Sequence, residues 1–303
     1  MLEDAAQQPA LSPTRPGMLE RSKRVETLTK VCVEDLLSAF GLGGLRRGRR
    51  PLESLSRILA RRLALQVTTY DGIVGESGLT EGGVWALERM ARRVEVEGRE
   101  NVPREGPLLL ASNHPGLSDT VALFATTPRS DLRVVAAERP FLGALPNTSR
   151  YLLTMSETSP GRFGLVRAAT RHLREGGAVL TFPGGKIEPD PTVLPGAAEA
   201  LDRWSESVDL FARLVPSLLI VPTIVSGVLS PTPLRNPLTF LRRRKEDREW
   251  LAATIQMLTP GLYDVGVRVE FGRPVSAGDS LESTVSQAVL EEARLLIERC
   301  EIR

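Results

Sequence analysis

The N-terminal part of the chain has apolar residues at helical spacing. Apolar side chains recur every three or four positions from Val25 to Phe40 and again from Leu52 to Leu63, which is the period of a helix with one buried face. The glycines of "GLGGL" separate the two stretches. The pattern predicts a helical N-terminal subdomain over residues 21–78, and the glycine-rich stretch 71–83 predicts a turn near its end.

Farther along, short apolar runs alternate with stretches of helical period. This alternation indicates an α/β fold, a mixed and largely parallel sheet flanked by helices, which we assign to a domain of residues 79–303. The predicted strands are "VEVEG", Leu108 to Ser112, "LRVVAA", "AVLTF", Leu218 to Val228 and "YDVGVRVEFGRPV". The predicted helices are Val84 to Arg92, one from about Ser118, Leu165 to Arg174, Ala197 to Arg203 and Leu281 to Cys300.

Neither the N-terminus nor the longest apolar stretch predicts membrane insertion. The opening "MLEDAAQQPALSPTRPG" lacks the basic start and apolar run of a signal peptide, so residues 1–20 are predicted to be a disordered tail. The stretch from Leu214 to Leu229 is interrupted by Pro216 and Pro222 and is rich in β-branched residues, which favours a buried strand. We therefore expect no transmembrane helix.

The charge balance gives the whole molecule no strong field. The chain has 39 Lys and Arg against 37 Asp and Glu, so nothing implies nucleic acid as a partner. Cys32 and Cys300 lie near opposite ends, without metal-ligand spacing, which argues against a disulfide framework and a structural zinc. The expectation is a reducing, cytoplasmic location.

The loop after the strand at Leu108 to Ser112 pairs a histidine with an aspartate. In "SNHPGLSD", Pro115 and Gly116 make a tight turn, so Asp119 on the first turn of the next helix can reach one nitrogen of His114. An aspartate that holds a histidine in one tautomer suits a general base. The spacing is also met by an aspartate that only caps its helix beside an unrelated histidine.

Other catalytic constellations have little support in the sequence. His172 is isolated on a predicted helix with no third ligand nearby, which argues against a metal site. The sequence has no G-x-S-x-G elbow that would mark a serine as a nucleophile.

A second informative loop, "FPGGKIEPDP", overlaps the end of the strand "AVLTF". Backbone amides at Gly184 and Gly185 can approach a ligand closely, and Lys186 offers a positive charge, an arrangement that suits phosphate or another anion. A plain glycine turn with a solvated lysine explains the stretch equally well. Because ligands of such sheets bind beyond the carboxyl ends of the strands, both loops fall where a site is expected.

Four ordered motifs together resemble the phospholipid and glycerol acyltransferase superfamily, which includes the glycerol-3-phosphate and lysophosphatidate acyltransferases. They are "VEVEGRENVPREGPLLLASNHPGLSD" with its H-x4-D motif, "FPGGKIEP", similar to the third motif, "LLIVPTIVSGV", similar to the fourth, and the ending "VRVEFGRPV". The likeness covers about residues 90 to 278. Four motifs in one α/β pattern are more specific than any one of them, and they favour the catalytic interpretation of His114 and Asp119.

The resemblance implies direct acyl transfer, with His114 as general base and Asp119 as its orienting residue. The base takes the proton of an acceptor hydroxyl, which attacks the thioester of acyl-CoA or acyl-carrier protein, while backbone amides near the helix start stabilise the oxyanion. The resemblance implies no metal and no cofactor besides this co-substrate, and an acceptor such as glycerol-3-phosphate or a lysophospholipid. The residues it suggests for substrate binding are Asn113, Gly116, Arg150, Pro183, Gly184, Gly185, Lys186 and Glu188.

The sequence departs from the family pattern in two motifs. The third motif commonly reads F-P-E-G-T-R, but Gly184 stands at the glutamate position and Ile187 at the arginine position, with Lys186 as a substitute charge. The second motif normally supplies an arginine for the acceptor phosphate, and "SRYLLTM" has none at that place. An acceptor without phosphate therefore also fits. The nearby candidates, which are otherwise solvated surface charges, are Arg150, Arg162 and Arg167.

Two basic clusters suggest contact with a membrane. "RRGRRP" lies between the two N-terminal helices, and "RRRK" spans Arg242 to Lys245. Clustered arginines beside an amphipathic helix can hold a protein on anionic lipid, here the inner face of the cell membrane, although a solvated basic face explains them too. The alternatives to acyl transfer are a non-catalytic lipid- or acyl-chain-binding protein on the same fold, and hydrolysis of thioesters or lysolipids.

Overall fold

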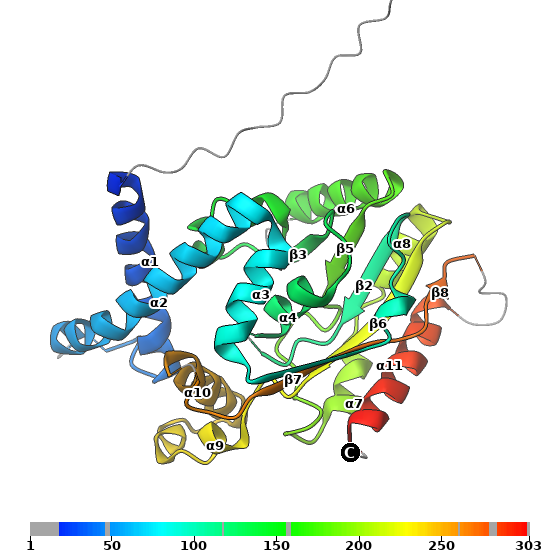
Figure 1. The fold of residues 1–303 in the computed structure, drawn as a ribbon. Helices are drawn as coiled ribbons and strands as arrows, with labels where there is room; N and C mark the ends of the chain where they lie inside the picture. Colours follow the sequence, from blue (N-terminus) through cyan, green and yellow to red (C-terminus); the bar gives the residue numbers. More distant parts are fainter. Residues whose placement is uncertain are drawn as a thin grey trace, which may run out of the picture.

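A mixed β-sheet of eight strands forms the centre of the part of the chain that the computed structural model describes, which is residues 18–45, 49–116, 118–155, 159–259, 261–278 and 284–301. The strands lie in the order β1-β7-β6-β2-β5-β3-β4, and β8 pairs with β6 (Figure 1). Their bounds are β1 (Arg93–Glu97), β2 (Leu108–Ser112), β3 (Arg133–Ala137), β4 (Leu152–Met155), β5 (Ala178–Thr181), β6 (Leu219–Ser226), β7 (Gly266–Phe271) and β8 (Val275–Ser276).

Strand β2 lies in the middle of the sheet. Leu110 of β2 pairs with Val221 of β6 on one side and Leu180 of β5 on the other, and both pairings are parallel. Strands β3 and β4 continue the parallel arrangement, whereas β7 and β8 run antiparallel to β6. The prediction of a mixed, largely parallel sheet flanked by helices is confirmed.

The side chains of β2 alternate between two hydrophobic layers, as the pleat of a strand requires. Leu108 and Leu110 pack on the face covered by α3 and α4, while Leu109 and Ala111 pack on the face covered by α6, α7, α8 and α11. Fully burying a leucine stabilises the fold by roughly 1.5–3 kcal/mol. The helices are α1 (Met18–Ala39), α2 (Arg49–Ser77), α3 (Leu79–Met90), α4 (Ser118–Thr126), α5 (Pro140–Gly143), α6 (Ser159–Arg174), α7 (Ala197–Ala200), α8 (Ser207–Leu214), α9 (Pro231–Leu234), α10 (Lys245–Leu258) and α11 (Val285–Glu301), and the 3-10 turns are η1 (Arg99–Asn101), η2 (Thr148–Tyr151), η3 (Leu201–Arg203) and η4 (Pro237–Leu241).

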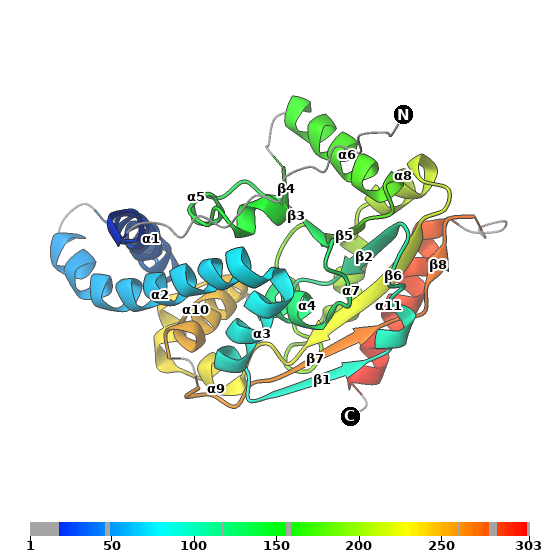
Figure 2. The same cartoon turned by 45° about the horizontal axis from the view of Figure 1, so that its top comes forward.

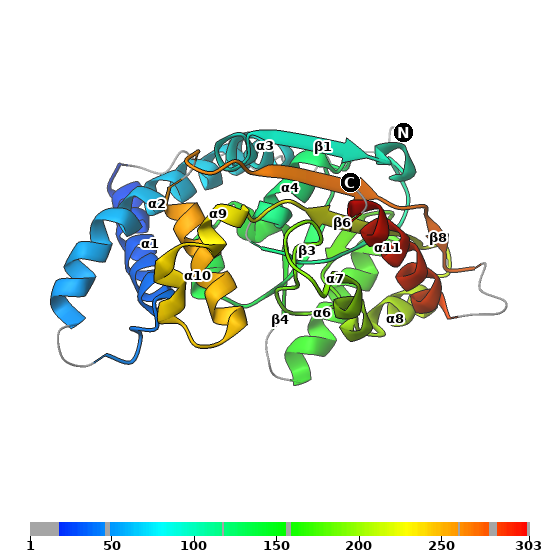
Figure 3. The same cartoon turned by 90° about the horizontal axis from the view of Figure 1, so that it is seen from below.

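The long N-terminal helices α1 and α2 lie at one end of the molecule together with α10 (Figure 3). Cys32 and Leu36 of α1 pack against Ala60 of α2. On another side of α1, Ala39 packs against Leu251 of α10. The predicted helical N-terminal region is therefore present, and it is extended by a helix from the C-terminal half of the chain.

The longest apolar stretch forms the buried strand β6, as predicted. Within the described ranges, no helix is both long enough and apolar enough to cross a membrane. The predicted tail, residues 1–20, lies outside the described residues except for its last three, which begin α1. The predicted start of the C-terminal helix at Leu281 also lies outside them, and α11 is described from Val285.

The glycine-rich turn predicted over residues 71–83 is wrong. Only Gly78, with a φ of 92°, separates α2 from α3. A Cβ on Gly82 would lie 2.4 Å from a side-chain carbon of Val74, and one on Gly83 would lie 2.7 Å from a backbone nitrogen of α4. These glycines let three helices approach closely, and that contact outweighs the helix penalty of about 1 kcal/mol per glycine.

Two further differences concern the C-terminal half. The stretch predicted as one strand, "YDVGVRVEFGRPV", contains β7 and then the start of β8. Pro274 lies between these two strands and has no N–H to donate to a ladder, which accounts for the break. The pattern also does not predict α8 or α10, whose apolar faces pack on α11 and on α1.

Candidate active site

The loops that follow β2, β5 and β6 meet at the carboxyl ends of these strands. The three strands are neighbours and parallel, with β2 between the other two (Figure 2). Asn113 and His114 follow β2, residues 182–190 follow β5, and residues 227–230 follow β6. The two loops that the sequence analysis singled out are thus adjacent, at the edge where such sheets bind ligands.

Asn113 fixes the start of the first loop. Its side-chain amide donates to the backbone carbonyl of Val225 at 2.9 Å, and its side-chain oxygen accepts from the backbone N–H of Val225 at 2.8 Å. The residue is buried, so both contacts are shielded from water. Asn113 therefore extends the pairing of β2 with β6 by one step and sets the direction in which His114 leaves the sheet.

His114 and Asp119 are in direct contact. Nδ1 of His114 lies 2.7 Å from Oδ2 of Asp119, which sits on the first turn of α4 and is fully buried. The same carboxylate accepts from the backbone N–H of Gly116 at 3.0 Å and from the hydroxyl of Thr120 at 2.9 Å. Because an ionised carboxylate only accepts hydrogen bonds, Nδ1 carries the proton, and Nε2 is left as the basic nitrogen.

The surroundings of His114 act on its protonation in opposite directions. Burial disfavours the imidazolium, but the charge of Asp119, its hydrogen bond and the charge of Glu188 outweigh burial and raise the pKa of His114 above its ordinary value. The ring also stacks on Phe182, with 4.6 Å between centroids. About a quarter of the side chain, 28%, stays accessible, so a ligand can reach the ring.

Glu188, suggested above for substrate binding, faces the protein. One carboxylate oxygen accepts from the backbone N–H of His114 at 2.9 Å, and the other accepts from Nε1 of Trp204 at 2.8 Å. The backbone N–H of Glu188 in turn donates to the carbonyl of His114 at 2.9 Å. The residue is only 5% exposed, and this burial raises the pKa of its carboxyl group.

The rest of the second loop is more open. Pro183 is buried and Gly184 is half-buried, whereas Gly185 and Lys186 are exposed. Gly185 has a φ of 64°, a conformation that favours glycine. The exposed Gly185 and Lys186 are placed where an anion could approach, next to the His114 loop.

Asp190 was not singled out by the sequence analysis, although it ties the second loop to the third. Its fully buried carboxylate accepts from the N–H groups of Gly227, Val228 and Leu229 at 2.9, 2.8 and 3.2 Å. It also accepts from the N–H and hydroxyl of Thr192. The Asp-x-Thr turn is visible in the sequence, but the contact with the residues after β6 is not.

The candidate arginines for an acceptor phosphate lie near β4, the strand at one edge of the sheet. Arg150 belongs to η2, just before β4, and β4 is separated from β2 by β5 and β3. Arg162 and Arg167 lie on α6. All three are exposed, and residues 156–158, which connect β4 to α6, lie outside the described part of the chain.

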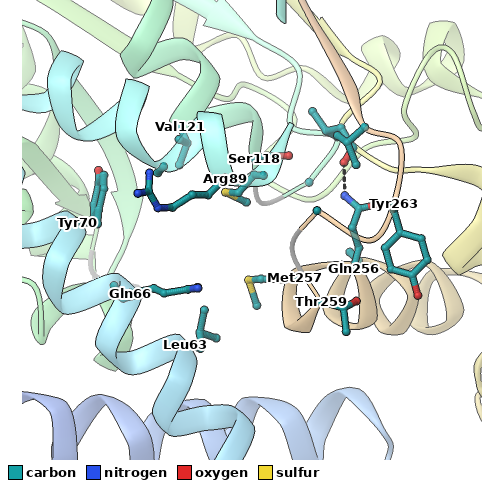
Figure 4. A pocket seen from close by; sticks show the side chains of 18 of the residues that line it. Leu63, Gln66, Tyr70, Arg89, Ser118, Val121, Gln256, Met257, Thr259 and Tyr263 are labelled. Atoms are coloured by element: carbon teal, nitrogen blue, oxygen red, sulfur yellow. Dashed lines mark hydrogen bonds between the residues drawn. The ribbon is translucent and has the colours of Figure 1, made fainter. Parts of the chain in front are cut away.

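A largely apolar pocket of about 220 Å³ opens beside the His114 loop. Pro115, Gly116 and Ser118 line it together with residues of α2, α3 and α10. Figure 4 shows Leu63, Ser118 and Met257 around this space. Gln66, Tyr70 and Arg89 add polar groups from α2 and α3 (Figure 4). The apolar side chains around it include Leu63, Val67, Met90, Val121, Leu145 and Met257.

Comparison with known proteins gives one family match. Residues 93–226 match the family described as Acyltransferase, a stretch that includes both loops and β6. Among solved structures, the chain is similar to the 1-acyl-sn-glycerophosphate (LPA) acyltransferase PlsC from Thermotoga maritima, with 16% identity, a TM-score of 0.47, and coverage of 94% of this chain and 96% of that one. No curated protein sequence matches the chain.

Proposed function

We propose that the chain is an acyltransferase, which the match of residues 93–226 to the acyltransferase family supports, and that it moves a fatty acyl group from acyl-CoA or acyl-carrier protein to a hydroxyl of a glycerolipid-type acceptor. The observation that carries the proposal is the contact between His114 and Asp119, beside an apolar pocket. Glycerol-3-phosphate and lysophospholipids are the acceptors we favour.

In the proposed reaction His114 acts first as a base and then as an acid. Nε2 takes the proton of the acceptor hydroxyl while its oxygen attacks the thioester carbon, and the imidazolium is stabilised by Asp119. The tetrahedral oxyanion is stabilised by backbone amides near the start of α4. When the C–S bond breaks, the leaving thiolate takes the proton from Nε2, so a new ester and a free thiol result.

The apolar pocket suits the acyl chain of the donor. Pro115 and Gly116, which directly follow His114 in the chain, line the pocket together with residues of α2 and α10. A chain bound there would leave its thioester carbon near His114. The helices outside the sheet would then limit the length of the chain that fits.

The acceptor would approach from the exposed side of the second loop. Gly185 and Lys186 offer backbone amides and a positive charge for a phosphate, with Arg150 as a more distant candidate. An acceptor without phosphate also fits, because the second loop has only one cation. No separate cofactor or metal is needed for the proposed steps.

We place the enzyme on the cytoplasmic face of an anionic membrane. Leu55, Ile58 and Leu59 form an exposed apolar stripe on α2, and Phe240 and Leu241 of η4 are 67% and 64% exposed. The first set lies on α2 with Arg57, Arg61 and Arg62, shortly after the cluster "RRGRRP", and the second set directly precedes the cluster at Arg242 to Lys245. Arg242 donates to the carbonyl of Ser38, which holds the second cluster against α1. Apolar side chains rimmed by arginines suit a lipid surface.

Product identification separates the proposal from its alternatives. Thiol release from a long-chain acyl-CoA is measured with glycerol-3-phosphate, lysophosphatidate, other lysophospholipids and phosphate-free hydroxyl acceptors, and the products are identified by mass. An acylated acceptor supports transfer and names its substrate class. Free fatty acid as the only product would indicate a thioesterase, and acyl-CoA or acyl-carrier-protein binding with no product from any acceptor would indicate a lipid-binding protein.

A further inference from the structure

The space where residue 184 would place a side chain is already filled. A Cβ on Gly184 would lie 2.3 Å from Oε1 of Glu188 and 2.9 Å from its Cδ. The φ of Gly184 is not positive, so its backbone does not require glycine. The glycine is therefore required by the carboxylate of Glu188, which folds back over it. Gly184 stands where the family pattern commonly has glutamate, and the carboxylate of Glu188 fills the space beside its Cα.

Glu188 holds the backbone of His114 from two sides. Its carboxylate accepts from the N–H of His114 and its own N–H donates to the carbonyl of His114, both at 2.9 Å. Trp204 donates to the remaining carboxylate oxygen and fixes the rotamer. Two donors thus converge on one carboxylate, which an amide could not satisfy, because it has one oxygen only.

We propose that Glu188 is a positioning residue for the general base, and that the missing side chain of Gly184 leaves the space that admits its carboxylate. This inference rests on the proposed function, because it treats His114 as the base. Glu188 does not touch the acceptor or the thioester. It holds the main chain of His114 so that Nε2 points into the site, and it places a second negative charge near the imidazole.

The charges near His114 and Glu188 change the pKa values of both side chains. Asp119 and Glu188 both raise the pKa of His114, while His114 and Arg203 favour the ionised form of Glu188 against its burial. Removing the charge of Glu188 should therefore lower the pKa of His114. A residue with a purely structural role would change stability without this shift.

Histidine NMR tests the inference without any turnover. The chain has only two histidines, so the ring signals of His114 and His172 can be followed together through a pH titration. In Glu188→Gln we expect the pKa of His114 to fall, because the charge of Glu188 helps to raise it. The ring of His172 contacts the carbonyl of Asp131 instead, so its signals can be told apart from those of His114 by substitution of either residue. An unchanged His114 titration in this variant would overturn the proposal.

Kinetics give the second readout. Loss of a hydrogen bond to a charged group corresponds to roughly 10–100-fold, so kcat of Glu188→Gln should fall by about that factor, with little change in KM for acyl-CoA. The acid limb of the pH–rate profile should move to lower pH. If the protein transfers no acyl group at all but the His114 titration still shifts, the positioning role stands and the proposed function fails.

Gly184→Ala by itself, which keeps Glu188, covers the case in which Glu188→Gln does not fold, and a double-mutant cycle adds a further test where Glu188→Ala folds. Gly184→Ala should displace the carboxylate and reproduce the loss of kcat, and it should add nothing in a Glu188→Ala background. Gly72→Ala is the matched control, since nothing lies within 4 Å of its added Cβ. Equal losses from Gly184→Ala with and without Glu188 would contradict the proposal.

Discussion

The carboxylate of Asp119 and the imidazole of His114 are joined by a contact of 2.7 Å between Oδ2 and Nδ1. The same oxygen accepts from the backbone of Gly116, and the other oxygen accepts from Thr120. Gly116 and Thr120 therefore orient the carboxylate of Asp119, which holds the ring of His114. This arrangement leaves one nitrogen of His114, Nε2, free to exchange a proton with a ligand.

Asp119→Asn should lower kcat by about 10²–10⁴-fold, the range that general-base catalysis contributes. The side chain keeps its size, but both oxygens of Asp119 accept hydrogen bonds. In either orientation of the asparagine, its NH2 group would therefore face another donor. Steady-state kinetics with acyl-CoA would measure the loss. A variant with wild-type kcat would show that Asp119 only caps α4.

The pH dependence of activity and of stability should run in opposite directions. His114 must be neutral to act as a base, so kcat/KM should fall as the pH drops through its raised pKa. The same raised pKa stabilises the folded protein fully below the ordinary value of about 6.5, and this contribution is lost as the pH rises through the folded pKa. Urea unfolding of wild type and His114→Ala across this window isolates the contribution. A difference between the two that does not depend on pH would contradict the assignment.

Asp190→Ala should destabilise the protein by at least about 3 kcal/mol. The change leaves the N–H groups of Gly227, Val228 and Leu229 without their acceptor, and a buried unsatisfied group costs about 1–3 kcal/mol. Asp202→Ala is the control, because the Asp202 side chain is 67% exposed and its ion pair should contribute about 0–1 kcal/mol. Chemical denaturation compares the free energies of unfolding of the two variants. Similar losses of stability would contradict the inference that Asp190 holds the second loop to the residues after β6.

Leu63→Phe should shift the donor preference toward shorter acyl chains. Leu63 lines the apolar pocket from α2, so a larger ring there shortens the space beyond Pro115. Leu65→Phe, two residues along the same helix and exposed, should leave the preference unchanged. Rates with a series of acyl-CoA lengths test the pair. If neither variant changes the profile, the acyl chain lies elsewhere.

Vesicle binding should depend on the exposed residues of η4 and on the arginines that follow it. Phosphatidylglycerol vesicles should sediment the protein at low salt, and Arg243→Ala and Arg244→Ala should each weaken binding roughly fivefold, from about 1 kcal/mol per basic residue. Phe240→Ala should weaken it as well, whereas Phe163→Ala, on α6 and 72% exposed, should not. Equal binding of all variants to the vesicles, or no binding by wild type, would contradict the proposal that these residues contact a membrane.

Local patterns predicted most strands of the sheet and the possibility of a contact between His114 and Asp119, and the four ordered motifs then favoured the dyad. The apolar runs at β2, β5 and β6 are buried and short, and His114 and Asp119 are only five positions apart, so their contact needs only local geometry. The meeting of the two loops followed from the general placement of sites in parallel sheets.

Contacts between distant segments were not predictable in the same way. Glu188 reaches the backbone of His114 across 74 positions, and Asp190 reaches Val228 across 38. Nothing in either local pattern reports a partner on another loop. The glycines of α3 misled for a related reason, since Gly83 is placed by its contact with α4 and not by its own helix propensity.

The most direct test of the account is acyl transfer by wild type and His114→Ala at equal acyl-CoA occupancy, with binding measured by calorimetry. We expect the variant to bind acyl-CoA with unchanged affinity, because the pocket is formed by other residues, and to lose acceptor-dependent thiol release. Acyl transfer at the wild-type rate by a folded His114→Ala protein would contradict the account, because the reaction would then not use this histidine.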